Sequence, residues 1–170
     1  MGDRPKALFR IVIDGPIEAI FRELTKTDSP QGAVFNSMLT TRALQPGNPM
    51  QMRTVSGKHA VVVGEVLEVD PPRRFAHTHR FTQHGDPFCK VIYDLKPVAG
   101  GVEVTLTVED IPVGTKTATE MQRGGMFILN NLKAIVETGR PPLAARVMYT
   151  LFDVLEFVLP KRTRSEHWPL

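Results

Sequence analysis

The sequence predicts an α+β protein in which a curved antiparallel sheet packs against one long helix. The helix is expected from about Thr117 to Thr138, because apolar residues recur there at alternating spacings of three and four, and Gly139 ends the pattern. From roughly Val34 to Ile111 the chain reads as short strands separated by turn residues. A helix with one apolar stripe needs a partner surface, so we expect the sheet to wrap around it.

Composition and charge narrow the class of protein. With 42% hydrophobic and 23% charged residues, the 170-residue chain is expected to be globular rather than disordered. One cysteine, Cys89, excludes an internal disulfide, and the first residues lack the apolar segment of a signal peptide, so we expect a cytoplasmic protein. A net charge of +3 is too small to indicate a nucleic-acid partner, and none is expected.

The elements before the long helix follow from alternation and from turn residues. A strand is expected over about 7–14, and a short helix over 16–25, because Pro16 suits a first helical turn. A second short turn or helix is expected to begin at Asp28. Strands then follow at about 34–44, 50–55, 59–69, 75–82, 88–98 and 102–111. Ala99-Gly100-Gly101 is the expected hairpin turn before the last of them.

Two adjacent glycines, Gly124 and Gly125, interrupt the middle of the long helix. Each costs about 1 kcal/mol relative to alanine in a helix interior, so we expect a structural reason for them. Either the sheet approaches the helix closely there, or the missing side chains leave room for another molecule. Polar residues, Asn131 among them, are expected to cover the side of the helix away from the sheet.

A further amphipathic helix is expected over Leu143–Leu159. It is short for a membrane span, which needs about 20 mostly apolar residues, so no transmembrane segment is expected. Its wide apolar arc leaves three uses open: packing on its own domain, self-association, and lying on a membrane surface. We expect self-association into a homodimer. The basic cluster that follows, Lys161, Arg162 and Arg164, is interpreted as a solvated tail.

Three blocks of sequence, together with the first-helix residues PIEAIFREL, carry a resemblance to a known superfamily. The blocks are GEVLEVDPPRRFAHTHRF (Gly64 to Phe81), DLKPVAGGVEVTLTVED (Asp94 to Asp110) and RGGMFILNNLKAIVETG (Arg123 to Gly139). They resemble the helix-grip fold of the START-like or SRPBCC superfamily, and within it proteins similar to the heat-shock-chaperone ATPase activator and to polyketide cyclases. The resemblance implies a helix-grip domain over residues 1–140, followed by a helical extension and basic tail over residues 141–170.

The chain departs from the pattern of these relatives at two places. Relatives often carry tryptophan after the first helix and a Gly-Trp pair in the late helix, where this chain has AVFNSML (Ala33 to Leu39) and Gly125-Met126. Met126 is expected to fill the space of the missing tryptophan, because its side chain is flexible.

The resemblance implies a cavity between the sheet and the long helix, and strand alternation indicates which side chains line it. Phe75, His77, His79 and Phe81 share one face of their strand. The polar groups expected to point inward are His77, His79 and Tyr93. The residues expected to bind a small apolar ligand are Met52, Phe75, His77, His79, Phe81, Val91, Tyr93, Leu106, Met121, Gly125, Met126 and Leu129.

The expected function is binding of a small hydrophobic or amphipathic molecule in that cavity, without a cofactor. One alternative is a cofactor-independent cyclase or dehydratase in which His77 or His79 moves protons and Tyr93 donates a hydrogen bond. Another is a protein-interaction module like the chaperone activator. The histidine pair lies near His84 and Cys89, but this spacing matches no recognised metal motif, so no metal site is expected.

Overall fold

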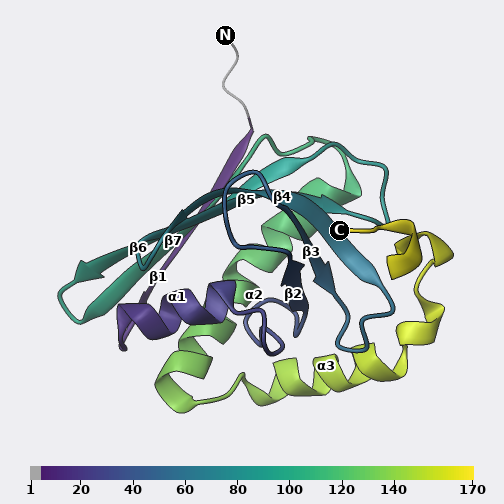
Figure 1. Cartoon of the computed structure of the whole chain (residues 1–170). Coiled ribbons are helices and arrows are strands. Elements are labelled where there is room, and N and C mark those ends of the chain that lie inside the picture. The colour runs from purple at the N-terminus through teal and green to yellow at the C-terminus, as the bar shows by residue number, and fades with distance from the viewer. Residues whose placement is uncertain (1–4) are drawn as a thin grey trace, which may run out of the picture.

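The computed structural model describes residues 5–170 and contains a seven-stranded antiparallel sheet that curves around a long helix, α2 (Figure 1). The start of the chain, on which the expectation about a signal peptide partly rests, lies outside the described residues. The strands are β1 (Lys6–Ile13), β2 (Met38–Thr41), β3 (Pro49–Arg53), β4 (Ala60–Asp70), β5 (Arg74–Phe81), β6 (Cys89–Val98) and β7 (Gly101–Glu109). The α-helices are α1 (Ile17–Thr25), α2 (Lys116–Thr138) and α3 (Leu143–Val154).

The order of strands across the sheet is β1-β7-β6-β5-β4-β3-β2. Each strand from β2 to β7 lies beside its neighbour in sequence. Strand β1 forms the other edge of the sheet and pairs antiparallel with β7, with Lys6 opposite Glu109 and Ile13 opposite Val102. The predicted α+β fold, a curved antiparallel sheet around a long helix, is confirmed.

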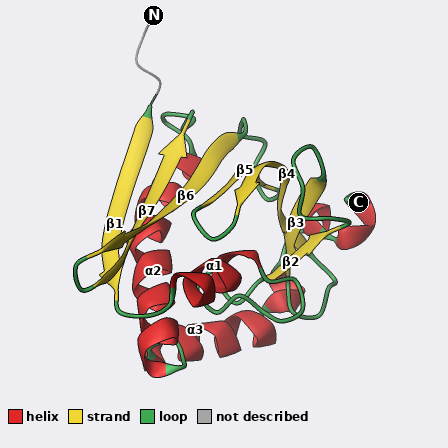
Figure 2. Cartoon of the chain, turned by 60° about the vertical axis from the view of Figure 1, so that its left-hand side comes forward, coloured by secondary structure: helices red, strands yellow, loops and turns green. Residues whose placement is uncertain are grey.

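Helix α2 buries its apolar stripe, which includes Met121, Leu129 and Leu132, against the concave face of the sheet (Figure 2). The Thr115 side chain accepts the N–H of Ala118 and caps the first turn, and Gly139 ends the helix in the left-handed conformation. Both ends of the helix therefore follow from local sequence.

Gly125 allows the sheet to approach α2 closely. A Cβ atom on this residue would lie 2.3 Å from Cε2 of Phe9 on β1, closer than packed atoms come. Of the two explanations for the paired glycines, close packing therefore applies at Gly125, because the Phe9 ring occupies the space.

The segment between α1 and β2 differs from the prediction. Of the turn or helix expected at Asp28, residues 27–37 form turns, and these continue past the expected start of the strand, with Phe35 and Asn36 at left-handed φ values of 54° and 55°. The strand expected from Val34 therefore begins only at Met38. The buried Gln31 side chain donates to the carbonyls of Leu24 and Lys26. Carbonyls at the end of α1 thus accept hydrogen bonds that the N–H groups of a further helical turn would otherwise donate.

Helix α3 follows α2 after Gly139 and is shorter than predicted, since a 3₁₀ turn over Glu156–Val158 follows it. The Tyr149 hydroxyl donates to the Gly32 carbonyl and accepts from Nδ2 of Asn131, at 2.7 and 3.2 Å. Asn131 is buried by this contact, contrary to the prediction that it lies on a solvent-facing side of α2.

Most of the apolar arc of α3 is exposed. Ala145 and Tyr149 alone are fully buried in this helix, whereas eight large apolar side chains of α3 and the 3₁₀ turn are 47% to 80% exposed. We call this surface the α3 face: Leu143, Val147, Leu151, Phe152, Val154, Leu155, Phe157 and Val158. Within residues 5–170 no helix is both long and apolar enough to cross a membrane.

The C-terminal residues are docked on the sheet rather than solvated, so the prediction of a solvated tail is wrong for their backbone (Figure 1). Thr163 is completely buried, and its hydroxyl accepts a 2.8 Å hydrogen bond from Nδ1 of His59. The Ser165 hydroxyl donates to the Gly57 carbonyl, and Nε2 of Gln51 donates to the Trp168 carbonyl. These partners are distant in sequence, which is why local charge did not indicate them.

Candidate functional site

The interior face of β5 carries a row of four rings. The ring centroids of Phe75 and His77 are 5.3 Å apart, those of His77 and His79 are 5.9 Å apart, and those of His79 and Phe81 are 4.7 Å apart. Tyr93 on β6 lies opposite Phe75 and stacks with it at 6.5 Å. Strand alternation therefore placed Phe75, His77, His79 and Tyr93 correctly on the buried face.

The two histidines have ring nitrogens without partners. Nδ1 of His77 lies 2.8 Å from the Thr78 carbonyl, and because a carbonyl only accepts, this nitrogen carries the proton. Nε2 of His77 and both ring nitrogens of His79 are buried without a hydrogen-bond partner in the described part of the chain. Native proteins pair the great majority of buried polar atoms, so three such nitrogens in one place require an explanation.

Burial keeps these groups neutral. Desolvation lowers the pKa of His77 to about 4 and that of His79 to about 3, with proximity to His77 as a further cause for His79. Desolvation also raises the pKa of the Tyr93 hydroxyl above its ordinary value. At neutral pH the site therefore offers uncharged rings and a protonated hydroxyl. His77 Nε2 is a free acceptor, and His79 has one donor and one acceptor.

Of the other ten residues predicted to bind a ligand, most lie in the core. Seven belong to the buried hydrophobic core, where their side chains contact one another between sheet and helix: Met52, Phe75, Val91, Tyr93, Leu106, Met121 and Leu129. Phe81 is partly buried against this core, and Gly125 is covered by Phe9. Met126 is 37% exposed on α2, so the prediction that it fills an interior space is wrong.

Three polar residues near the histidines serve other contacts. Nε2 of His84 lies 3.2 Å from a carboxylate oxygen of Glu120. Asp86 accepts from the backbone N–H and the hydroxyl of Thr117, at the start of α2. The Cys89 thiol is buried, which raises its pKa to about 11 and leaves it a poor nucleophile. No cluster of three or more metal-ligating side chains lies within residues 5–170.

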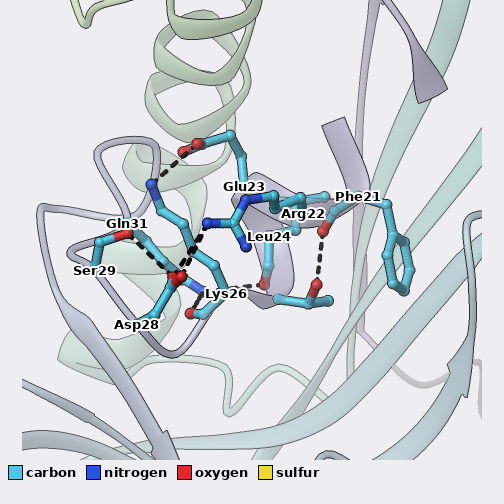
Figure 3. Close-up of polar contacts among 9 residues, drawn as sticks. Phe21, Arg22, Glu23, Leu24, Lys26, Asp28, Ser29 and Gln31 are labelled. Carbon is cyan, nitrogen blue, oxygen red and sulfur yellow. Dashed lines mark hydrogen bonds and ion pairs between the residues drawn. The ribbon is translucent and has the colours of Figure 1, made fainter. Parts of the chain in front are cut away.

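A surface hollow of about 540 Å³ lies elsewhere, beside α1. Figure 3 shows that its cations are already paired, with Arg22 3.0 Å from Asp28 and Lys26 3.0 Å from Glu23. The hollow shares none of the twelve residues predicted to bind a ligand; its lining is Glu18, Phe21, Arg22, Thr25, Lys26, Thr27, Asp28, Pro71 and Pro72. Sequence periodicity could not indicate it, because the cis Pro71–Pro72 turn and α1 meet only in the fold.

The curved sheet, the long helix in its concave face and the buried polar groups between them define a protein of the helix-grip class. Comparison with protein families gives the narrower group. Residues 14–137 match the family described as activator of Hsp90 ATPase homolog 1-like protein, and the chain belongs to that family. The resemblance drawn from the sequence is therefore confirmed. No curated protein matches the chain.

Solved structures share the fold at low sequence identity. CalU16 from Micromonospora echinospora has a TM-score of 0.61 and 18% identity, over 86% of this chain and 82% of that one. The Hsp90 activator PFC0360w from Plasmodium falciparum has a TM-score of 0.61 and 19% identity, over 80% and 97% of the two chains. The Aha1 dimer from Colwellia psychrerythraea has a TM-score of 0.62 and 18% identity, over 79% and 98%. A dimer thus exists among proteins of this fold.

Proposed function

We propose that this protein binds a small, mostly apolar molecule that carries a neutral hydrogen-bonding group, between the sheet and α2. The observation that carries the proposal is the set of three unpartnered nitrogens on His77 and His79 in an otherwise apolar interior. Leaving a buried polar atom unpaired costs about 1–3 kcal/mol, so a ligand that pairs with these nitrogens gains what the protein alone lacks.

The hydrogen-bond roles define the chemistry of the ligand. Because Nδ1 of His77 donates to the Thr78 carbonyl, its Nε2 accepts, and a ligand hydroxyl is a suitable donor to it. A charged ligand group is disfavoured, since neutral histidines cannot balance it in a desolvated interior. A phenol or an alcohol on an apolar frame fits both requirements.

Binding there requires the interior to open, because core side chains contact one another in this structure. The connection between β5 and β6 is held to the first turns of α2 by the His84–Glu120 and Asp86–Thr117 contacts. Both contacts are polar and part-buried or exposed, so separating them costs less than separating the core. We infer that a ligand enters beside this connection.

A matched pair of probes tests the proposal. Naphthol and naphthalene have the same apolar frame, and only naphthol donates a hydrogen bond. We expect naphthol to raise the melting temperature more than naphthalene does at the same concentration, because a ligand that binds the folded state more tightly stabilises it more. Native mass spectrometry should find it bound once per chain.

The double variant His77→Phe with His79→Phe is the control, because it keeps two rings of similar size and removes all three unpartnered nitrogens. It should remain folded and should respond equally to the two probes. If the unaltered chain also responds equally, or to neither, the histidines do not serve ligand recognition and the proposal is wrong.

Catalysis by the same histidines is a weaker candidate. A general base works best when its pKa lies near the working pH, and burial lowers the pKa of both histidines to about 4 and about 3. These rings are suited to holding a hydroxyl rather than to taking its proton.

Chaperone binding is the second candidate function, and family membership favours it. It would use the outer surface of the sheet, where Glu103 on β7 is half-buried and faces away from the core. If it is correct, the protein should raise the ATPase rate of an Hsp90, and Glu103→Lys should reduce that effect while His79→Phe does not. An unchanged ATPase rate with the unaltered chain would exclude it.

A further inference from the structure

We propose that the α3 face docks on an anionic lipid surface. Eight large apolar side chains gather on this one short helix and its following turn, and Phe157 is 80% exposed. Proteins rarely leave so many neighbouring apolar side chains in water unless a partner covers them. The inference rests on α3 and the tail, and does not depend on a ligand in the interior.

The geometry of α3 suits a helix that lies in a membrane plane. Its inward side is fixed to the protein by Ala145 and Tyr149, so the apolar side is the one presented outward. The helix extends only from Leu143 to Val154, too few residues to span a bilayer. An amphipathic helix of this kind inserts its apolar side chains among lipid headgroups while its axis stays parallel to the surface.

Charge favours lipid over a second copy of the chain. Residues 140–170 contain five Lys or Arg and three Asp or Glu, so they carry +2 of the chain's net charge of +3. Arg140 precedes the α3 face, and Lys161 and Arg162 follow it, all with exposed side chains. One of the acidic groups, Glu156, already accepts hydrogen bonds from Thr54 and Ser56.

The basic residues at both ends of the α3 face disfavour a dimer formed through this face. In a two-fold dimer the same surface meets itself, so each basic end of α3 would lie near a basic end of the other copy, whether the helices run parallel or antiparallel. Juxtaposed like charges disfavour such an interface. Anionic headgroups instead attract both ends at once. The sequence alone left the membrane surface as one of three uses of this helix, and the exposed face with basic ends selects it.

Flotation of the purified full chain with vesicles tests the proposal. We expect it to float with vesicles of phosphatidylcholine and phosphatidylglycerol in equal parts, and much less with phosphatidylcholine alone. Replacing two exposed apolar side chains of the α3 face, Val154→Ser with Phe157→Ser, should weaken the partition by about tenfold or more. Replacing Lys161 and Arg162 by Gln should weaken it by about fivefold for each charge removed.

Two variants are matched controls. Val113→Ser removes an apolar side chain that is 75% exposed but lies before α2, and Lys96→Gln removes an exposed cation at the far end of β6. Both should bind vesicles as the unaltered chain does, and circular dichroism should show that all variants are folded.

Three outcomes would overturn the proposal. They are no flotation with the anionic vesicles, flotation that the Val154→Ser and Phe157→Ser changes leave intact, and equal losses in the Val113→Ser control. If the chain does not float but has twice its mass in solution, and the paired serine variant halves that mass, the α3 face belongs to a second copy.

Discussion

Helices α2 and α3 are both amphipathic, yet their apolar sides have opposite fates. Leu132 on α2 is completely buried under the sheet, whereas Leu151 on α3 is 53% exposed. Both residues lie on an apolar stripe at helical spacing, so the pattern alone does not distinguish them. The comparison shows that periodicity identifies the apolar side of a helix, while the partner that covers it depends on the rest of the fold.

The largest expected effect comes from truncating one leucine on each helix. Leu132→Ala should lower the free energy of unfolding by about 4 kcal/mol, because it removes buried methyl groups and leaves a cavity. Leu151→Ala should change it by less than about 0.5 kcal/mol, since its side chain contacts mainly solvent. Urea denaturation of the two variants measures both values. Equal losses would mean that the α3 face is covered in solution, by a second copy or by the chain itself.

Protonation provides a second way to compare the interior with α3, because His77 and His79 are buried in the interior and the residues of α3 include no histidine. The folded pKa values of about 4 and about 3 lie below the ordinary value of 6.5, so the unfolded chain binds protons first as the pH falls. Stability is therefore full above pH 6.5 and is lost as the pH falls below it. The loss should be on the order of 2 kcal/mol for each histidine between pH 7 and pH 5.

Urea denaturation at these two pH values checks this expectation. The His79→Phe variant should lose about half as much stability as the unaltered chain over the interval. Identical losses in both proteins would show that His79 is accessible to protons in the folded state, which contradicts its burial.

A smaller loss than those at Leu132 and at the paired histidines is expected where α2 and α3 meet. Tyr149→Phe removes the hydroxyl that joins Asn131 to the Gly32 carbonyl, and should cost about 1–2 kcal/mol because the buried amide loses its acceptor. Changing Asn131 to Leu as well should recover part of this loss. Faster amide exchange confined to α3 would locate the effect, whereas uniform exchange across the sheet would contradict a local contact.

Much of the fold could be predicted from sequence because the strands alternate and the long helix has one apolar stripe. The same alternation placed His77 and His79 on the buried side of β5. The expectation for Met126 came from the resemblance, and it failed for a geometric reason: a residue that follows Gly125 on a helix projects about 100° away from it, so both cannot face the sheet. Which of the predicted residues bind a ligand, and the division of the chain at residue 140, stay predictions.

The errors elsewhere share one cause, which is that contacts between distant residues leave no periodic signal. Gln31 ends α1 through its side chain and the chain then turns, so the strand expected from Val34 begins only at Met38. Asn131 has the polarity of a surface residue but is covered by Tyr149, eighteen positions later. The docked tail depends on His59 and Thr163, which meet only when β4 has joined the sheet.

The docked tail also determines how α3 meets a partner. The helix is held at its first residues by the turn after Gly139 and at its far end by the tail on the β3–β4 turn, where Glu156 accepts from Thr54 and Ser56. A free amphipathic peptide must become helical as it binds, and the lost conformational entropy reduces its affinity. In this protein α3 is already helical once the chain has folded. Binding a partner therefore costs the α3 face little further conformational entropy, and more of the free energy of the new contacts appears as affinity.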